Sequence, residues 1–278
     1  MNTLIIEAGS SKTDTVLISH TSQTSSPIHG PGVNPVTDPS YEQAPLANLD
    51  SYKDQDIHSV KYYGAGCINQ AVNNRVAAVI TSALGSEVMI EVKDDLLAVG
   101  RGLCQESQGI AVILGTGSNT GYYDGTTIAD GYKSCGYLLG DEGSGYRLGQ
   151  ELITRYARRL LSLEDIEYLE SQSEVRSDDI VPHIYESDNP RTLIASYAAY
   201  LTSCSDELKN EICQKVFAKF GEEILSPLSD KYQCPVYISG SIGYHFKEEL
   251  QETLKRRDIH VTSIVHSPLK GLIRFHSR

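Results

Sequence analysis

Two pairs of adjacent carboxylates are the side chains of this sequence best suited to chemistry. Asp141 and Glu142 lie within LLGDEGSGYRLG (138–149), and Asp94 and Asp95 lie within VKDDLL. A carboxylate can take a proton from a hydroxyl, orient a polar substrate or help to hold a metal ion. Each pair also has a structural interpretation, because Asp, Gly and Ser form turns and acidic residues favour helix N-termini.

Turns of small residues could bind phosphate. AGSSK (8–12) and GTGS (115–118) each join two strand-like segments, and a third glycine turn lies in ISGSIG (238–243). Such turns expose successive N–H groups and hydroxyls. Neither a Walker A motif nor a GxGxxG dinucleotide motif is present, because GTGSNTG and GSGYRLG are each one residue too long for the latter. One such turn is ordinary hairpin chemistry, whereas two matching turns favour a phosphate ligand.

The elements that must position these residues alternate between strands and helices, which predicts an α/β protein. Alternating and buried-type apolar runs predict strands, and small or apolar residues at helical spacing predict helices. Residues 25–40 are rich in turn formers, and 147–230 is largely helical. The predicted order is strands at 3–7 and 13–19, a strand at 59–66, a helix at 68–84, a strand and helix within 88–104, two strands within 109–133, the helical region, a strand within 234–243, a helix at 246–257, and a strand and turn within 259–271.

The pattern restarts after its first third. LIIEAGSSKTDTVLI (4–18) and AVILGTGSNTGYY (111–123) are both apolar strand, small polar turn and return strand. In this comparison, Gly9-Ser10 corresponds to Gly117-Ser118. This internal similarity predicts two related halves, with a boundary near residue 107.

Composition limits the partners. The 278 residues are 40% hydrophobic and 22% charged, which is typical of a soluble globular protein of one or two domains. The net charge of -12 argues against nucleic acid and anionic membranes, although not against a small anionic ligand. The N-terminus lacks a signal-peptide pattern and no apolar run is long enough to span a membrane. Six cysteines without a CxxC pair indicate reduced, mostly buried thiols and a cytoplasmic location.

Six segments resemble, in their order along the chain, the motifs of the sugar-kinase/Hsp70/actin superfamily. They are IEAGSSKTD, GAG, DDLLAV, ILGTGSN, LLGDEGSG and ISGSIG. Within it, the chain is similar to the family of N-acetylglucosamine kinases and BadF/BadG/BcrA/BcrD ATPases. GTGSN followed by GDEGSG is the most specific part. The resemblance implies two RNase H-like α/β lobes with ATP and Mg²⁺ in the cleft between them. Residues 1–107 would form the sugar and phosphate lobe, and residues 108–278 would form the nucleotide lobe with a helical insertion.

The resemblance also implies ligands for the nucleotide. The two turns would hold the β- and γ-phosphates from opposite lobes, although Lys12 is equally consistent with an exposed hairpin lysine. Glu7 stands where most members have Asp, and would hold Mg²⁺ through water. Gly240 would line the adenosine pocket. The phosphate-binding residues implied are Gly9, Ser10, Ser11 and Lys12 in the first turn and Gly115, Thr116, Gly117 and Ser118 in the second.

A kinase of this type needs a general base beside the acceptor hydroxyl. In the family, the catalytic Asp precedes the GTG glycine by about twenty residues and has a small residue three positions on. Asp95, with Ala98 after it and Gly115 further along, fits this spacing better than Asp94. At least one of the two carboxylates is expected only to favour the start of a helix.

The sugar ligands implied by the resemblance are dispersed along the chain. Asn34 matches an amide that hydrogen-bonds sugar hydroxyls, but Asn before Pro in a Gly/Pro run is also a common turn. Asp141 matches a carboxylate that orients the sugar, with Glu142 a weaker candidate for metal or supporting contacts. The full set expected to bind sugar is Asn34, Gly66, Asp95, Gly136 and Asp141.

The function implied is ATP-dependent phosphorylation of an amino-sugar hydroxyl, with N-acetylglucosamine 6-phosphate as the expected product. Two alternatives remain. One is an ATPase that activates a partner reductase through a cluster bridged across a dimer, but the cysteine that those activases carry is missing from GDEGSG here. The other is a non-catalytic sugar or nucleotide sensor. A homodimer is the assembly that the resemblance suggests.

Overall fold

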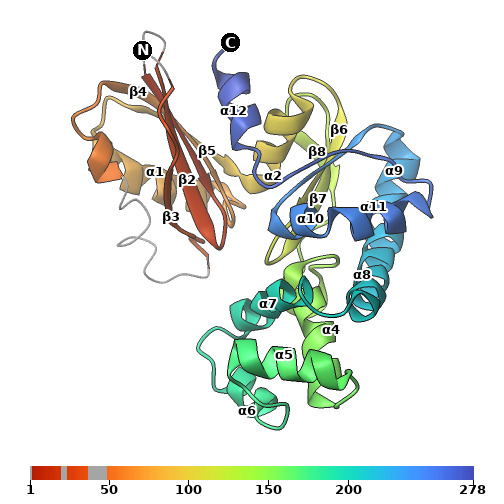
Figure 1. Ribbon diagram of the computed structural model, residues 1–278. Helices are drawn as coiled ribbons and strands as arrows, with labels where there is room; N and C mark the ends of the chain where they lie inside the picture. Colours follow the sequence, from red (N-terminus) through yellow and green to blue (C-terminus); the bar gives the residue numbers. More distant parts are fainter. Residues whose placement is uncertain (1, 20–23, 37–48) are drawn as a thin grey trace. The chain divides into compact units, whose positions relative to one another are not determined.

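The chain divides into two units in the computed structural model (Figure 1). The structure describes residues 2–19, 24–36 and 49–278; the last four positions of the turn-rich 25–40 segment lie outside the described residues. Among the described residues, no helix has both the length and the apolar character needed to cross a membrane. The first unit comprises Met1–Ser107, Gly125–Thr127 and Pro268–Arg278, and the second comprises Gln108–Asp124 and Ile128–Ser267.

Unit 1 is built on a five-stranded sheet in the order β3-β2-β1-β4-β5. β1 and β2 form an antiparallel hairpin, and β3 extends it. β4 and β5 add on the other side of β1 as parallel strands. Leu4, Ile5 and Ile6 are fully buried, as expected of a central strand that is covered on both faces. The strands are β1 Asn2–Ala8, β2 Lys12–Ser19, β3 Ile28–Pro31, β4 Ile57–Gly64 and β5 Met89–Asp94.

The helices of unit 1 begin at local caps or continue from strands. Asn69 caps the helix predicted at 68–84, because its side chain accepts a hydrogen bond from the Val72 N–H. The C-terminal helix was not predicted; the sequence there indicates only a strand and a turn. It begins after Pro268 and packs in unit 1, against η2. The elements are η1 Leu49–Tyr52, α1 Gln70–Leu84, α2 Asp95–Val99, the π-helical turn η2 Gly100–Cys104 and α12 Leu269–His276.

Unit 2 repeats the sheet of unit 1. Its order is β10-β9-β6-β7-β8, with β6, β7 and β8 antiparallel and with β9 and β10 parallel to β6. The two related halves expected from the sequence are therefore confirmed in topology. The strands are β6 Gly109–Leu114, β7 Ser118–Tyr123, β8 Ile128–Gly131, β9 Val236–Ser239 and β10 Val261–Val265.

Strand pairing corrects the match between the two hairpin turns. The last paired residue of β1 is Ala8, and the last of β6 is Leu114. Gly9 is therefore equivalent to Gly115, and not to Gly117 as the letters alone suggest. The sequence comparison matched the two Gly-Ser pairs, whereas the structure matches the ends of β1 and β6. The turn after β1 is then one residue longer than the turn after β6.

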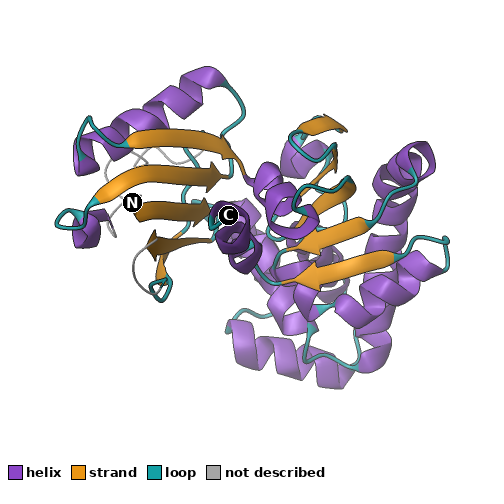
Figure 2. Ribbon diagram, turned by 90° about the horizontal axis from the view of Figure 1, so that it is seen from above, coloured by secondary structure: helices purple, strands orange, loops and turns teal. Residues whose placement is uncertain are grey.

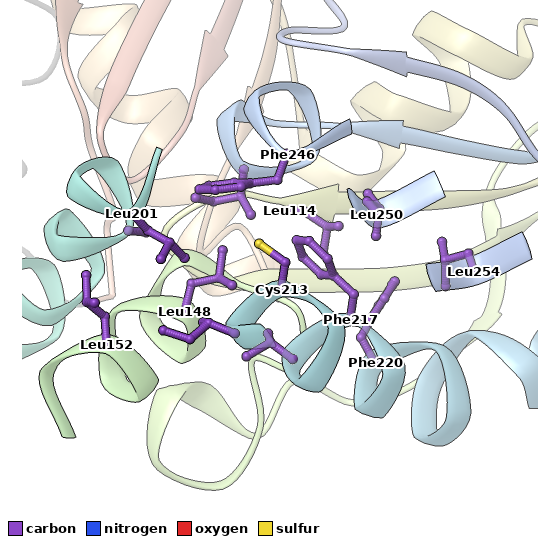
Figure 3. Close-up of a cluster of buried hydrophobic side chains, with 14 of the residues drawn as sticks. Leu114, Leu148, Leu152, Leu201, Cys213, Phe217, Phe220, Phe246, Leu250 and Leu254 are labelled. Atoms are coloured by element: carbon purple, nitrogen blue, oxygen red, sulfur yellow. The ribbon is translucent and has the colours of Figure 1, made fainter. Parts of the chain in front are cut away.

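Helices flank both sheets (Figure 2), and those of unit 2 enclose its larger core. Leu114 on β6 lies in this core with residues of α4, α7, α8 and α11, among them Leu148, Leu201, Phe217 and Leu250 (Figure 3). The predicted helical region is confirmed. The helices are α3 Gly136–Leu139, α4 Gly145–Ala157, α5 Leu163–Ser173, α6 Ile180–Tyr185, α7 Pro190–Leu201, α8 Asp206–Phe220, η3 Gly221–Leu225, α9 Ser226–Tyr232, α10 Ser241–His245 and α11 Lys247–Lys255.

Candidate active site

Three candidate segments of unit 1 leave its sheet at the same edge. Strand register places Ala8, Gly64 and Asp94 side by side at the ends of β1, β4 and β5. The Ala65 N–H also donates to the Ala8 carbonyl at 2.9 Å. The AGSSK turn, the loop of Gly66 and the start of α2 therefore follow one another along this edge. In α/β proteins, the carboxyl ends of parallel strands are the usual position of a ligand.

The AGSSK turn is closed by a hydrogen bond from the Gly9 N–H to the Lys12 carbonyl at 2.9 Å. Ser10 and Ser11 are exposed at its tip. The Gly9 carbonyl accepts a hydrogen bond from the Val33 N–H at 3.0 Å, which holds the next loop beside the turn. The turn therefore presents small, accessible residues at the sheet edge.

Lys12 is held by a neighbour on its own strand. Its ammonium group lies 2.8 Å from a carboxylate oxygen of the buried Asp14, and His29 Nδ1 lies 2.7 Å from the other oxygen. Burial by itself would raise the pKa of Asp14, but the hydrogen bonds from Lys12 and His29 outweigh it and hold that pKa below its usual range. Lys12 thus neutralises Asp14 in this conformation.

Glu7 is half-buried near the end of β1, opposite Asp14 on β2 and Tyr63 on β4. Within the described ranges, no group of three or more His, Cys, Asp or Glu side chains is placed to hold a metal ion. Mg²⁺ that is bound with a nucleotide needs only one or two carboxylates, because water and phosphate oxygens supply its other ligands. A single carboxylate at this position is consistent with that arrangement.

Asn34 and Gly66 lie in contact. Gly66 has a φ of +80°, and a Cβ built there would lie 2.3 Å from Asn34 Oδ1. Only glycine satisfies both the backbone conformation and the space. The same Oδ1 accepts a hydrogen bond from the Val36 N–H at 3.0 Å, so the turn expected of Asn before Pro is also formed. The expected sugar ligands Asn34, after β3, and Gly66, after β4, are thus brought together.

The structure separates the roles of the two adjacent aspartates. Asp94 caps α2, with Oδ1 accepting a hydrogen bond from the Leu97 N–H at 2.9 Å. Asp95 is the first residue of α2, and no described side chain hydrogen-bonds to its carboxylate. Burial and the negative charge of Asp94 raise the pKa of Asp95 to about 6, although hydrogen bonds from its own N–H and that of Leu96 oppose the shift.

Cys67 connects the Gly66 loop with these carboxylates. Burial, together with the negative charges of Asp95 and Asp94, raises the pKa of its thiol to about 12. The pairing of Gly64 with Asp94 likewise places the loop after β4 beside the start of α2. A thiol with so high a pKa stays protonated at neutral pH and is a poor nucleophile.

In unit 2, GTGS and GDEGSG contact each other directly. The Gly145 N–H donates to the Gly115 carbonyl at 2.8 Å, and the Tyr146 N–H donates to the Thr116 carbonyl at 3.1 Å. The first turn of α4 therefore lies against the carbonyl side of GTGS. The turn itself is closed by the Gly115 N–H, which donates to the Gly117 carbonyl at 2.9 Å.

Asp141 is buried, has a φ of +59°, and reaches back to the same turn. Oδ1 accepts a hydrogen bond from the Ser118 N–H at 3.3 Å, and Oδ2 accepts one from Arg191 Nη2 at 3.2 Å. A Cβ on Gly117 would lie 2.4 Å from this Nη2 and 2.7 Å from Asp141 Oδ2. Glycine at 117 is therefore required for the carboxylate and the guanidinium to approach the turn.

The two remaining glycines of the predicted site differ in their surroundings. Gly240 follows β9, and a Cβ there would lie 2.2 Å from the carbonyl oxygen of Leu114, the residue before GTGS. Gly136 begins the short helix α3 on an exposed segment, and no atom lies within 4 Å of a Cβ built there. Gly240 is thus next to the second turn, whereas Gly136 faces open space.

No protein-family model and no curated protein sequence matches the chain. Solved structures do. A proposed N-acetylglucosamine kinase from Porphyromonas gingivalis matches with a TM-score of 0.89 and 29% identity, over 99% of this chain and 98% of that chain. One from Chromobacterium violaceum gives 0.75 and 17%, over 99% and 98%. A ROK family glucokinase from Streptomyces griseus, solved with glucose and AMPPNP, gives 0.60 and 14%, over 99% and 97%. The chain belongs to the actin-like ATPase superfamily.

The actin-like ATPase fold confirms the α/β class and the two lobes expected from the motifs. In this superfamily member, the site residues expected from the sequence fall in both units. Asn34, Gly66 and Asp95 meet at the sheet edge of unit 1, with the AGSSK turn. Asp141 and Gly240 meet at the GTGS turn of unit 2. Gly136 is also in unit 2, on an exposed segment.

No signal in the sequence pointed to Arg191 as a residue of this site. It follows the polar linker YESDNP and lies 50 residues from Asp141. No spacing rule connects the two, because their contact depends on how α7 packs. Glu142, by comparison, is half-buried, with no hydrogen bond from its side chain to a described residue.

Proposed function

We propose that this protein is an ATP-dependent kinase that phosphorylates a hydroxyl of an amino sugar, with N-acetylglucosamine as acceptor and its 6-phosphate as product. The observation that carries this proposal is Asp95. Its carboxylate is not used as the helix cap, lies at the sheet edge with Asn34 and Gly66, and has a pKa raised to about 6. The descriptions of the P. gingivalis and C. violaceum proteins favour the same substrate.

A pKa of about 6 suits a general base at neutral pH. Asp95 is mostly ionised there and remains basic enough to accept a proton as the acceptor oxygen attacks. In the transfer, that oxygen forms a bond to the γ-phosphorus while the bond to the leaving ADP oxygen breaks, and the hydroxyl proton passes to Asp95. Asp94, already accepting from the Leu97 N–H, is held away from this role.

The remaining residues fit the orientation of two substrates. Asn34 presents its amide beside Gly66, and a polar side chain on a fixed loop can orient a sugar hydroxyl. The AGSSK and GTGS turns, with Gly240, supply small residues for the nucleotide, and Glu7 offers one carboxylate for Mg²⁺. When bound, ATP would supply the phosphoryl group, and Mg²⁺ would neutralise part of the negative charge on the phosphates. Asp141 and Gly136 are the sugar ligands that we propose from unit 2.

The test is ADP release from the full chain over a panel of hexoses and amino sugars. We expect turnover with N-acetylglucosamine that falls by about 10²–10⁴-fold in Asp95→Asn, because general-base catalysis is worth that much. Asp94→Asn is the matched control, since Asn is as good a helix cap as Asp. It should retain turnover. Equal losses in both variants would remove the assignment of Asp95 as base, and no sugar-dependent ADP release would refute the kinase.

A further inference from the structure

The helical region that matched no motif brings a cation to the GTGS turn. Arg191 extends from the first turn of α7, and its Nη2 lies 3.2 Å from Asp141 Oδ2. The same nitrogen lies so close to Gly117 that a Cβ there would be 2.4 Å away. The Arg191 side chain is 26% exposed, and the Asp141 side chain is 4% exposed. A guanidinium therefore lies directly on a turn that is a candidate for phosphate binding.

Its position is set by the packing of α7 on α4. At Gly149, a Cβ would lie 1.9 Å from the Ile194 carbonyl oxygen, so the two helix backbones touch one turn beyond Arg191. Asn189 caps α7 by accepting from the Thr192 N–H at 3.1 Å. The guanidinium carbon also lies 5.9 Å from the centre of the Tyr137 ring, within cation–π range. These contacts place Arg191 before any ligand binds.

One part of this guanidinium lacks a partner. Arg191 Nε is buried and has no hydrogen-bond acceptor among the described residues. Leaving a buried donor unsatisfied costs about 1–3 kcal/mol, and more where the group is charged. Asp141 accepts from Nη2 only, so the donors of the guanidinium exceed the acceptors around it. A phosphate group offers several oxygens in a geometry that matches the guanidinium fork.

We propose that Arg191 binds the terminal phosphate of the nucleotide, with Asp141 positioning its guanidinium at the GTGS turn. This inference rests on the proposed kinase function. It assigns the helical region a part in phosphate binding, and Asp141 a second task besides the expected sugar contact. A neutral acceptor sugar offers no anion for Arg191, so the phosphate is the ligand that the charge favours. The charge on Arg191 also offsets negative charge on the transferred group, as guanidinium groups do in other phosphotransferases.

The first test measures binding alone. Calorimetry on the full chain compares ADP with AMPPNP, the probe that retains a third phosphate. We expect Arg191→Gln to lower the affinity for AMPPNP by about 10-fold or more and the affinity for ADP by less than about 3-fold. The reason is that one charge-assisted contact to the terminal phosphate is lost. Arg158→Gln, an exposed arginine at the end of α4, should change neither. Arg191→Lys keeps the charge without the fork, should give an intermediate loss, and serves if Arg191→Gln does not fold.

The second test measures turnover. In Arg191→Gln, kcat should fall by about 10²-fold or more, with the sugar KM within about 2-fold of wild type. Equal weakening of ADP and AMPPNP, unchanged AMPPNP binding, or a raised sugar KM with unchanged nucleotide affinity would overturn the assignment. Wild-type protein that does not bind AMPPNP would overturn both proposals. Wild-type protein that binds AMPPNP through Arg191 but shows no sugar-dependent turnover would refute the kinase alone.

Discussion

Replacing Asp95 with Asn should make the protein more stable at neutral pH while it lowers turnover by about 10²–10⁴-fold. The carboxylate pKa is raised from 3.8 to about 6, so folding disfavours its charged form. Each pKa unit corresponds to about 1.4 kcal/mol, which sets an upper limit of about 3 kcal/mol on this cost at pH 7. Because Asp95 is partly exposed to solvent, screening reduces the expected gain to roughly half of this limit.

The sign of the pH dependence follows from the direction of the shift. Above both pKa values, Asp95 is ionised in both states and its cost is complete. As pH falls through 6 toward 3.8, the folded protein takes up the proton first and the cost disappears. The advantage of Asp95→Asn should therefore shrink by about two thirds between pH 7 and pH 4.5.

Urea unfolding of both proteins at several pH values measures this advantage directly. Asp94→Asn is the matched control, because it keeps a capping side chain and removes the negative charge that adds to the raised pKa of Asp95. It should stabilise less than Asp95→Asn and move the acid limb of the pH–rate profile to lower pH. A variant Asp95→Asn that is less stable than wild type at pH 7, or a difference independent of pH, would refute the reasoning.

Three further substitutions test other contacts. Gly117→Ala places a methyl group 2.4 Å from Arg191 Nη2. The end of this flexible side chain must then move away from the turn, so the substitution should weaken AMPPNP binding, and calorimetry that shows wild-type affinity would contradict this. Tyr63→Phe removes the hydroxyl that accepts from Arg101 at 2.8 Å and lies 2.8 Å from His276 Nε2. It should lower the free energy of unfolding by about 1–3 kcal/mol in urea, because Arg101 Nη1 keeps only Glu91 as acceptor among the described residues and His276 loses a partner. A loss below about 0.5 kcal/mol, the size of an ordinary surface change, would show that this contact is replaced. Asp14→Asn should destabilise the protein at pH 7, because the lowered pKa of Asp14 shows that its charged form is the stabilising one. In urea titrations, the difference in free energy of unfolding between wild type and variant should shrink as pH falls through that pKa. A difference that grows on acidification would contradict this sign.

Local chemistry accounts for what could be predicted. Hairpins with small-residue turns, and a helix that follows an Asp-Asp pair, depend on residues a few positions apart. Asp94 is an example, since its side chain caps α2 by accepting from the N–H of Leu97, three residues further along the chain. The order of the elements, and with it the α/β class, followed from such local signals.

Other features needed contacts between distant segments. The α12 helix was missed because Pro268 suggested a turn, yet the helix packs on η2, where a Cβ on Gly271 would lie 1.9 Å from the Gly102 carbonyl oxygen. β3 was missed within a turn-rich segment because its pairing with β2, and not its own composition, makes it a strand. The sequence left two interpretations of Lys12, a phosphate ligand or an exposed hairpin lysine. In the fold, its ammonium group is paired with the carboxylate of Asp14.

By itself, the sequence determined the motifs, their order and the two related halves, because strand periodicity, turn chemistry and helix capping act over a few residues. The spacing implied by the resemblance already favoured Asp95 as base. Only the tertiary structure showed that Asp94 is the residue that caps α2, since both fit a helix start in one dimension. Only the tertiary structure also joined Arg191 to Asp141 and the GTGS turn, 50 residues apart along the chain. That contact depends on the packing of α7 against α4, which no local pattern encodes.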